Sequence, residues 1–349
     1  MNLCLKKRST SRIYGLDILK SICTFMVIMI HTGYPGELGN YAIVLSRIAV
    51  PIFFMITGFF YVESNDNKKL KKLKAIALLA IKAMIFYMII DLLKCIINKK
   101  NIYLYINEVF NIKKIAKFFL FNEPISGFHL WYLFAILYCL AIIYILNKII
   151  HNRIEQLLII FTPVLLLISL IFGKYSLAFL GVDIPIICVR NFAFDAIPFF
   201  SIGFIIRKWN IVDRTRDCKI RYMLIVAILF AVLNCLENYL LRLYNVNATR
   251  ESYISTIFLA ISVFIIFTNN YWNGKFKLFY IIGKEYTLYI YIIHIIILDC
   301  IWNLIKYMPG QTYSITQYLI PIIVFVLSII VSIIIKKIKY IISNMIKEI

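Results

Sequence analysis

Acidic, basic and titratable side chains lie along one face of the first hydrophobic segment of this chain. Lys20 and His31 are eleven residues apart, close to three turns of an α-helix, so their side chains share one face about 16 Å apart along the axis. Asp17 lies one turn before Lys20 and near the same face. Because an ionisable group in a membrane is costly and faces a protein interior or a watery cavity, this face predicts a functional site.

The chemistry that these residue types support is proton transfer or nucleophilic attack. An imidazole titrates near neutral pH and acts as a general base or as a nucleophile, so we expect His31 to be catalytic. The alternative is an interfacial histidine bonded to a loop carbonyl group. Lys20 and Asp17 join the catalytic set, although at i,i+3 spacing Asp17 could simply neutralise Lys20. Arg47 joins it because it lies in a second apolar segment, close in depth to His31.

Five further side chains in or beside apolar segments are candidate substrate contacts: Trp131, Tyr132, Arg190, Glu237 and His294. Trp131 and Tyr132 also fit the alternative of aromatic anchors at a membrane interface. Glu237 is interpreted as either a proton-handling or a structural carboxylate. Asp91 and Lys94, at i,i+3 spacing, are expected to form a structural ion pair.

The composition is that of a polytopic membrane protein. Of 349 residues, 62% are hydrophobic, and the mean hydropathy is +0.86, whereas a soluble domain is only about half apolar. The apolar runs are continuous rather than alternating, which excludes a transmembrane β-barrel and leaves α-helices. We therefore predict an all-α bundle of about ten transmembrane helices, at roughly 15–32, 41–62, 73–97, 130–147, 155–173, 191–207, 221–243, 253–269, 286–304 and 318–336.

The net charge of +21 is explained by topology rather than by nucleic acid. Basic residues cluster in short loops that fall on one side if both termini are cytoplasmic, as the positive-inside rule requires. The clusters are Lys6 to Arg12, Lys68 to Lys74, Lys148 with Arg153, Arg207 to Arg221, Lys275 to Lys284 and Lys336 to Lys347. The segment 98–129 breaks this pattern, and we expect an amphipathic surface helix in it around Ile112 to Leu120. No nucleic-acid partner is expected, because no basic domain with interleaved aromatic residues is present.

The cysteines and the absence of repeats narrow the class further. Eight cysteines without a C-x-x-C spacing indicate free thiols, so no zinc or other metal site is expected. No internal repeat is visible, which disfavours an inverted-repeat transporter. Asp17 and Lys20 interrupt the first apolar run, which predicts a retained helix rather than a cleaved signal peptide. The chain, 1–349, is interpreted as one integral membrane domain.

Motifs in order along nearly the whole chain resemble the acyltransferase-3 family of membrane acyltransferases. The most specific is a basic residue, ten residues and a histidine, here Lys20 and His31. The others are the run from Val50 to Phe59, His129-Leu130-Trp131-Tyr132-Leu133, Arg190-Asn191-Phe192 with the run from Pro198 to Phe204, and the run from Tyr286 to His294. Within the family, Arg190-Asn191 with the Pro-Phe-Phe run is similar to the membrane half of vancomycin-resistance serine racemases.

This resemblance implies a ten-helix bundle that moves an acyl group, usually acetyl from acetyl-CoA, to an extracytoplasmic carbohydrate or similar acceptor. The expected partners are then acyl-CoA as donor, the acceptor, and the lipid bilayer. The family's Arg-x-x-Arg motif is represented only by a lysine run, which we expect to contact the CoA phosphates through Lys68, Lys69, Lys71 and Lys72. Two alternatives stay open: a small-molecule transporter that moves solute without acyl transfer, and an inactive membrane scaffold.

The expected topology is testable by labelling. In a variant without native cysteines, a single cysteine added near Asn67 should be shielded from an impermeant thiol reagent on intact cells, because basic loops stay cytoplasmic. Cysteines added between Gly33 and Asn40 should react. Labelling near Asn67 from outside would overturn the whole orientation.

Overall fold

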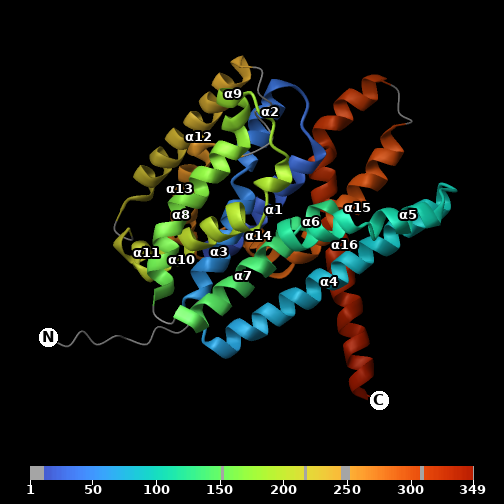
Figure 1. The fold of residues 1–349 in the computed structure, drawn as a ribbon, viewed down its shortest axis with the longest axis horizontal. Coiled ribbons are helices and arrows are strands. Elements are labelled where there is room, and N and C mark those ends of the chain that lie inside the picture. Colours follow the sequence, from blue (N-terminus) through green and yellow to red (C-terminus); the bar gives the residue numbers. More distant parts are fainter. Residues whose placement is uncertain (1–11, 151–152, 216–217, 245–251, 307–309, 349) are drawn as a thin grey trace.

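The fold is a bundle of helices of very different lengths (Figure 1). The computed structural model describes residues 12–150, 153–215, 218–244, 252–306 and 310–348, with side chains for all of these except 310–315 and 345–348. Every regular element in these ranges is helical, which confirms the predicted all-α class.

Seven long or central helices form the body of the bundle: α1 (Tyr14–Thr32), α3 (Ala49–Tyr61), α4 (Asp66–Ile97), α7 (Trp131–Ile150), α10 (Ile197–Lys208), α15 (Thr287–Ile305) and α16 (Gly310–Glu348). The remaining α-helices are α2 (Gly36–Ser46), α5 (Ile102–Val109), α6 (Ile112–Phe121), α8 (Ile154–Leu170), α9 (Ser176–Leu180), α11 (Ile211–Arg214), α12 (Ile220–Leu243), α13 (Ile254–Thr268) and α14 (Lys277–Glu285). Short 3-10 or π turns are η1 (Phe128–Leu130), η3 (Ile171–Tyr175), η4 (Ile186–Cys188), η5 (Phe192–Ala196) and η6 (Asn270–Trp272).

Eight segments of the described chain are long and apolar enough to cross a bilayer. They match eight of the ten expected spans. The other two expected spans correspond to α13, which has 15 residues, and to η5 followed by α10. Only 11% of the most apolar stretch of 154–180 and 17% of that of α12 is buried inside the protein, so these helices present their apolar sides outward, as lipid-facing helices do.

One expected span, 41–62, is not continuous. It is divided into α2 and α3 at Arg47 and Ile48. Pro51 lies four residues after Arg47, has no N–H to bond the Arg47 carbonyl group and crowds it, which explains the break. The interruption places Arg47 at a helix end, where its side chain is only partly exposed.

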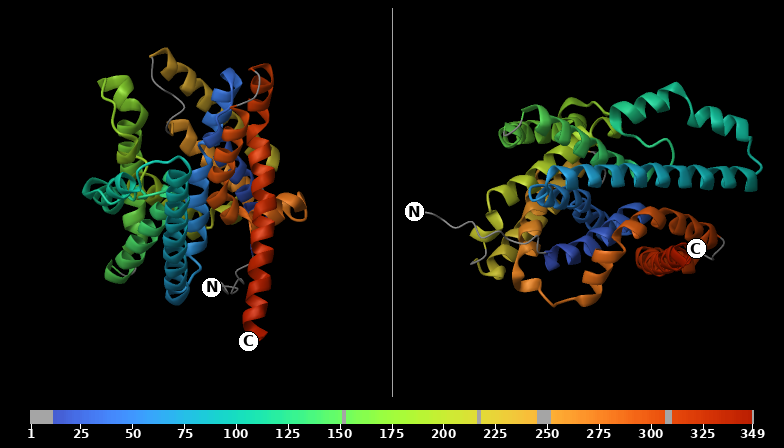
Figure 2. Two further views of the ribbon diagram at one scale, coloured as in Figure 1. Left: turned by 90° about the vertical axis from the view of Figure 1, so that its right-hand side faces the viewer. Right: turned by 90° about the horizontal axis from the view of Figure 1, so that it is seen from below.

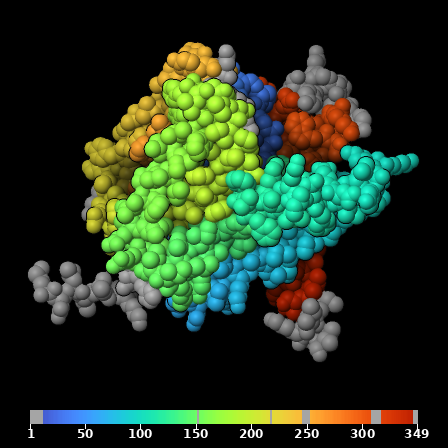
Figure 3. Space-filling view, viewed as in Figure 1, coloured from blue at the N-terminus to red at the C-terminus, as the bar shows by residue number. Residues whose placement is uncertain are grey.

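Two helices extend further than expected. The segment 98–129, which breaks the pattern of basic loops, contains the helices α5 and α6. The helix α4 starts at Asp66 rather than near residue 73, and the long α16 projects beyond the other helices at its C-terminal end (Figures 1 and 2). The predicted surface helix around Ile112 to Leu120 is confirmed as α6, which buries none of its residues. Together with α5, it lies across the outside of the bundle (Figure 3).

Glycines allow the central helices to touch backbone to backbone. A Cβ atom added to Gly58 of α3 would lie 1.9 Å from the carbonyl oxygen of Phe200 in α10, and one added to Gly203 would lie 2.0 Å from that of Met55. A Cβ atom on Gly283 of α14 would lie 1.7 Å from the carbonyl oxygen of Asp17 in α1. Small residues at such crossings are the usual means of close helix packing in membranes.

Ion pairs gather the basic clusters at one end of the bundle. Lys148 Nζ lies 2.6 Å from Asp66, Lys208 Nζ 3.6 Å from Glu155, and Lys336 Nζ 2.5 Å from Glu285, while Arg207 pairs with Glu63 and Arg12 with Asp17. At the opposite end, Arg242 pairs with Glu37.

The expected pair between Asp91 and Lys94 is wrong. Lys94 Nζ lies 2.6 Å from Asp299 of α15, and Asp91 accepts a hydrogen bond of 2.6 Å from the Ser126 hydroxyl group. Both partners come from other segments of the chain, because contacts between helices here outweigh the i,i+3 pairing within α4.

Candidate functional site

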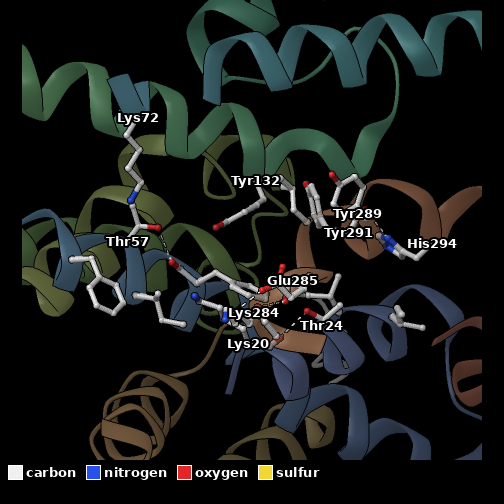
Figure 4. Close-up of a pocket in the computed structure, with 18 residues that line it drawn as sticks. Lys20, Thr24, Thr57, Lys72, Tyr132, Lys284, Glu285, Tyr289, Tyr291 and His294 are labelled. Atoms are coloured by element: carbon white, nitrogen blue, oxygen red, sulfur yellow. Dashed lines mark hydrogen bonds and ion pairs between the residues drawn. The ribbon is translucent and has the colours of Figure 1, made fainter. Parts of the chain in front are cut away.

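A cavity of about 440 Å³ lies between α1, α3, α4, α7, α14 and α15 (Figure 4). Its size is typical of small-molecule sites. Its polar lining comes from Lys20, Thr24, Thr57, Lys72, Tyr132, Lys284, Glu285, Thr287, Tyr289, Tyr291 and His294, and its apolar lining mainly from α1, α3 and α15. The cavity therefore joins lysines near the start of α1 to a histidine in the middle of α15.

Three lysines from three helices line the part of this cavity that lies away from His294. The contact of Gly283 with α1 brings Lys284 beside Lys20, and Lys72 enters from α4 (Figure 4). Lys20 is bonded to Asp17 at 3.0 Å, as the i,i+3 spacing predicted. Lys72 has no carboxylate within 4.0 Å among the described residues, and the positive charge of Lys20 acts on it. We call Lys20, Lys72 and Lys284 the lysine end; of the three, only Lys72 is without a carboxylate within 4.0 Å in the described part of the chain.

Two carboxylates hold the lysine end in place. Asp17 is 1% exposed and accepts hydrogen bonds from both Lys20 and Arg12. Glu285 bonds Lys336 of α16 and lies 3.5 Å from Lys284. The hydrogen bond from Lys336 lowers the pKa of Glu285, so this carboxylate stays ionised at neutral pH.

Of the four lysines expected to bind a donor, the structure brings only Lys72 to the cavity. Lys69 lies 3.8 Å from Asp66 and over the ring of Tyr61, in a separate small hollow. Lys68 and Lys71 are exposed on the side of α4 away from the cavity lining. Successive residues of a helix point in different directions, so a run of lysines cannot all face one site.

Three histidines meet at the other end of the cavity. The ring centroids of His31 and His294 are 5.3 Å apart, and those of His129 and His294 are also 5.3 Å apart. His129 and His294 are each 1% exposed, whereas His31 is partly exposed. We call these three side chains, from α1, η1 and α15, the histidine cluster.

In the sequence, His129 stands out only as part of a motif at the start of an expected span. Its backbone oxygen accepts a hydrogen bond from the Tyr291 hydroxyl group, and its ring packs 4.7 Å from that of Tyr87. A signal was present in the sequence, because His31, His129 and His294 each belong to one of the family-like motifs. What the sequence lacked was the long-range contact that brings the three motifs together.

Two arginines lie near enough to His31 for their charges to act on it. The positive charges of Arg47 and Arg190 both act on the His31 imidazole. Arg190 also stacks on Trp131, with its guanidinium carbon 5.3 Å from the ring centroid. Groups of this kind stabilise negative charge that develops on a reacting oxygen.

Asparagines fix the turn that carries Arg190. The Asn191 side chain caps η5 by accepting hydrogen bonds from the N–H groups of Ala193 and Phe194, at 2.9 and 3.1 Å. The buried Asn122 accepts one of 2.7 Å from the N–H group of Phe192 and donates one of 3.2 Å to the Trp131 carbonyl oxygen. Arg190 and Trp131 are thereby held against each other.

The two aromatic candidates have different positions. Tyr132 lines the cavity and packs on Tyr291, with ring centroids 5.6 Å apart. Trp131 supports Arg190 instead and is not part of the cavity lining.

The structure places Glu237 away from the cavity. Its carboxylate accepts hydrogen bonds from the backbone N–H groups of Ile254 and Ser255, at 2.9 and 3.0 Å, and from the hydroxyl groups of Ser255 and Tyr175. It therefore caps the N-terminus of α13, where a carboxylate is stabilising. Of the two roles considered for Glu237, these contacts favour the structural one.

Another hollow, of about 210 Å³, adjoins the C-terminal end of α1. It is lined by Thr32, Gly33, Tyr34, Pro35, Trp302, Gln317 and Ile320. Thr32, which lines this hollow, directly follows His31 in the sequence. Among the described residues, no group of histidines, cysteines or carboxylates is arranged to hold a metal ion.

The fold is a polytopic helical bundle, and its cavity has lysines at one end and a histidine at the other. Such an arrangement is suited to chemistry on an anionic or polarised substrate in a membrane protein. The sequence matches the acyltransferase domain family over residues 13–337. The chain therefore belongs to this family of membrane acyltransferases, as its motifs indicated.

Two curated relatives are amino-acid racemases of Enterococcus faecalis. One is 24% identical over 338 residues, which are 89% of this chain and 45% of the racemase. The other is 31% identical over 144 residues, 40% of this chain and 19% of the racemase. The chain thus spans less than half the length of these relatives. No solved structure matches it.

The role of Glu237 can be tested by separating stability from activity. Glu237→Ala removes the acceptor of several hydrogen bonds and should destabilise the protein by about 1–3 kcal/mol, seen as a lower melting temperature in detergent. Turnover per folded molecule should not change. Glu237→Gln, which keeps one acceptor oxygen, should be milder. A loss of turnover at unchanged melting temperature would instead show that Glu237 contributes to the substrate site.

Proposed function

We propose that this protein transfers an acyl group from acyl-CoA, with acetyl-CoA as the simplest donor, to a hydroxyl group of an extracytoplasmic acceptor such as a cell-envelope carbohydrate. One observation carries the proposal: a single cavity extends from the lysine end to His294, whose ring lies beside that of His31 in the histidine cluster. Family membership supports the reaction class. In this proposal the lysine end faces the cytoplasm, where acyl-CoA is made, because basic loops stay on the cytoplasmic side.

The lysine end is suited to the polyanionic head of the donor. Lys72 has no carboxylate within 4.0 Å among the residues that the structure describes, and Lys20 and Lys284 line the same cavity. Phosphate groups bind such a cluster by charge-assisted hydrogen bonds. The acyl arm of the donor, long and narrow, then extends along the cavity toward α15. The rise of α1 from Lys20 to His31, about 16 Å, sets the distance that this arm must span.

The histidine cluster is suited to the transfer itself. An imidazole removes the proton of the acceptor hydroxyl group, the oxygen attacks the thioester carbonyl carbon, and the carbon–sulfur bond breaks. The alternative is that His31 first takes the acyl group covalently. In either case Arg47 and Arg190 lie where they can stabilise negative charge on the oxygen. The hollow beside Thr32 gives the acceptor an approach from the opposite side.

The donor site predicts a contrast within one lysine run. Lys72→Gln should raise KM for acyl-CoA about tenfold, because a charge-assisted hydrogen bond to phosphate is lost from the cavity that Lys72 lines. Lys71→Gln is the matched control: Lys71 is exposed like Lys72 but does not line the cavity, so KM should change little at physiological salt. The measurement is thiol release from acyl-CoA by purified protein in vesicles, with an acceptor present.

Two results would contradict the donor site. Equal effects of Lys71→Gln and Lys72→Gln would show that the run acts only as a diffuse charge. Wild-type protein that releases no thiol from acyl-CoA with an extract of envelope acceptors, and leaves these polymers unmodified by mass spectrometry, would overturn acyl transfer altogether.

A further inference from the structure

The imidazole that lines the large cavity is that of His294. His294 is part of the lining, whereas His31 and His129 are not. The donor arrives through this cavity in the proposed function, on which the present inference rests. The thioester sulfur therefore meets His294 before it meets either of the other histidines.

The backbone fixes which nitrogen of His294 carries the hydrogen. Its Nδ1 atom lies 2.8 Å from the carbonyl oxygen of Tyr291 and 3.2 Å from that of Ile290. A carbonyl oxygen only accepts hydrogen bonds, so Nδ1 carries the hydrogen and Nε2 of the neutral ring has a free lone pair. This Nε2 atom is buried and has no hydrogen-bond partner among the described residues.

A buried nitrogen without a partner costs free energy, so its position needs an explanation. The nearest titratable groups are other imidazoles: His31 and His129, each with its ring centroid 5.3 Å from that of His294. The positive charges of Arg47 and Arg190 also act on His31. At this spacing a proton can pass between His31 and Nε2 of His294 directly or through one water molecule.

We infer that His294 is a second catalytic residue, which carries the acceptor's proton from His31 to the departing CoA sulfur. His31, nearer the outer hollow, takes the proton from the acceptor hydroxyl group as its oxygen bonds to the acyl carbon. The proton moves from His31 to Nε2 of His294. As the carbon–sulfur bond breaks, the sulfur takes the bonding electron pair and then this proton, which leaves CoA as a thiol and both rings neutral.

The need for such a group follows from the chemistry of the leaving sulfur. An alkyl thiol has a pKa near about 8.5, so its thiolate is a poor leaving group inside a low-dielectric cavity unless it is protonated. A general acid at this position contributes on the order of 10²-fold or more to the rate. Lys20 and His31, the two residues of the family motif, would by themselves place no acid beside the sulfur.

The test uses a variant that keeps the structural hydrogen bond and removes only the proton carrier. In His294→Asn, the side-chain NH2 group can still donate to the Tyr291 carbonyl oxygen, but no nitrogen lone pair remains at the position of Nε2. Turnover is measured with acyl-CoA and with an aryl thioester of the same acyl group. The aryl thiolate is a good leaving group and needs no proton.

The expected result is a defect that depends on the leaving group. His294→Asn should lose about 100-fold in kcat with acyl-CoA, at unchanged KM, but less than about fivefold in kcat/KM with the aryl thioester. His31→Ala should lose activity with both donors. Leu288→Ala, which changes the same cavity wall from the same helix, should affect both donors equally.

Three results would overturn the inference. Near-wild-type turnover of His294→Asn with acyl-CoA would show that only its backbone hydrogen bond matters. An equal loss with both donors would place His294 in binding or packing rather than at the sulfur. If His294→Asn does not elute as a monodisperse protein, His294→Gln, which restores a polar atom near Nε2 but no base, serves the same comparison. Wild-type protein inactive with both donors would instead end the proposed function, and the inference with it.

Discussion

Ionisable side chains cannot lie in a bilayer without a partner or a watery cavity, and this constraint organises the whole protein. Asp17 is fully enclosed because Lys20 and Arg12 neutralise it, and Glu285 is held by Lys336. Lys72, without such a partner, is placed at the cavity. The charges that the sequence spreads over α1, α4, α14 and α16 therefore meet at one end, where they leave room for an anionic ligand.

The apolar packing of the bundle makes that meeting possible. Glycines at the crossings of α3 with α10 and of α1 with α14 remove the side chains that would separate the backbones. At the α1–α14 crossing, the close contact at Gly283 sets Lys284 beside Lys20. Farther along α1, the turn fixed by Asn122 and Asn191 holds Arg190 on the side of His31. Packing and chemistry are thus parts of one arrangement, with cations at one end of a cavity and imidazoles at the other.

The sequence predicted those features that depend on local periodicity. The helical class, the surface helix α6, the shared face of Lys20 and His31 and the pair of Lys20 with Asp17 all follow from spacing within one helix. Features that depend on contacts between distant segments were missed or misplaced. Lys94 bonds Asp299 rather than Asp91, Glu237 caps α13, and His129 joins the cluster through η1. Pro51 indicated that the helix in span 41–62 would be weakened. Only the structure shows that the break lies at Arg47.

The central claim is that the histidine cluster performs acyl transfer, and His31→Ala tests it most directly. Thiol release from acyl-CoA in the presence of acceptor is measured on purified protein in vesicles, beside an elution profile that reports folding. The account predicts a monodisperse protein whose turnover falls on the order of 10²-fold or more, since neither an acyl carrier nor a base remains at that position. Lys20→Arg, which keeps the charge near Asp17, should retain part of the activity. Wild-type turnover in His31→Ala would contradict the account.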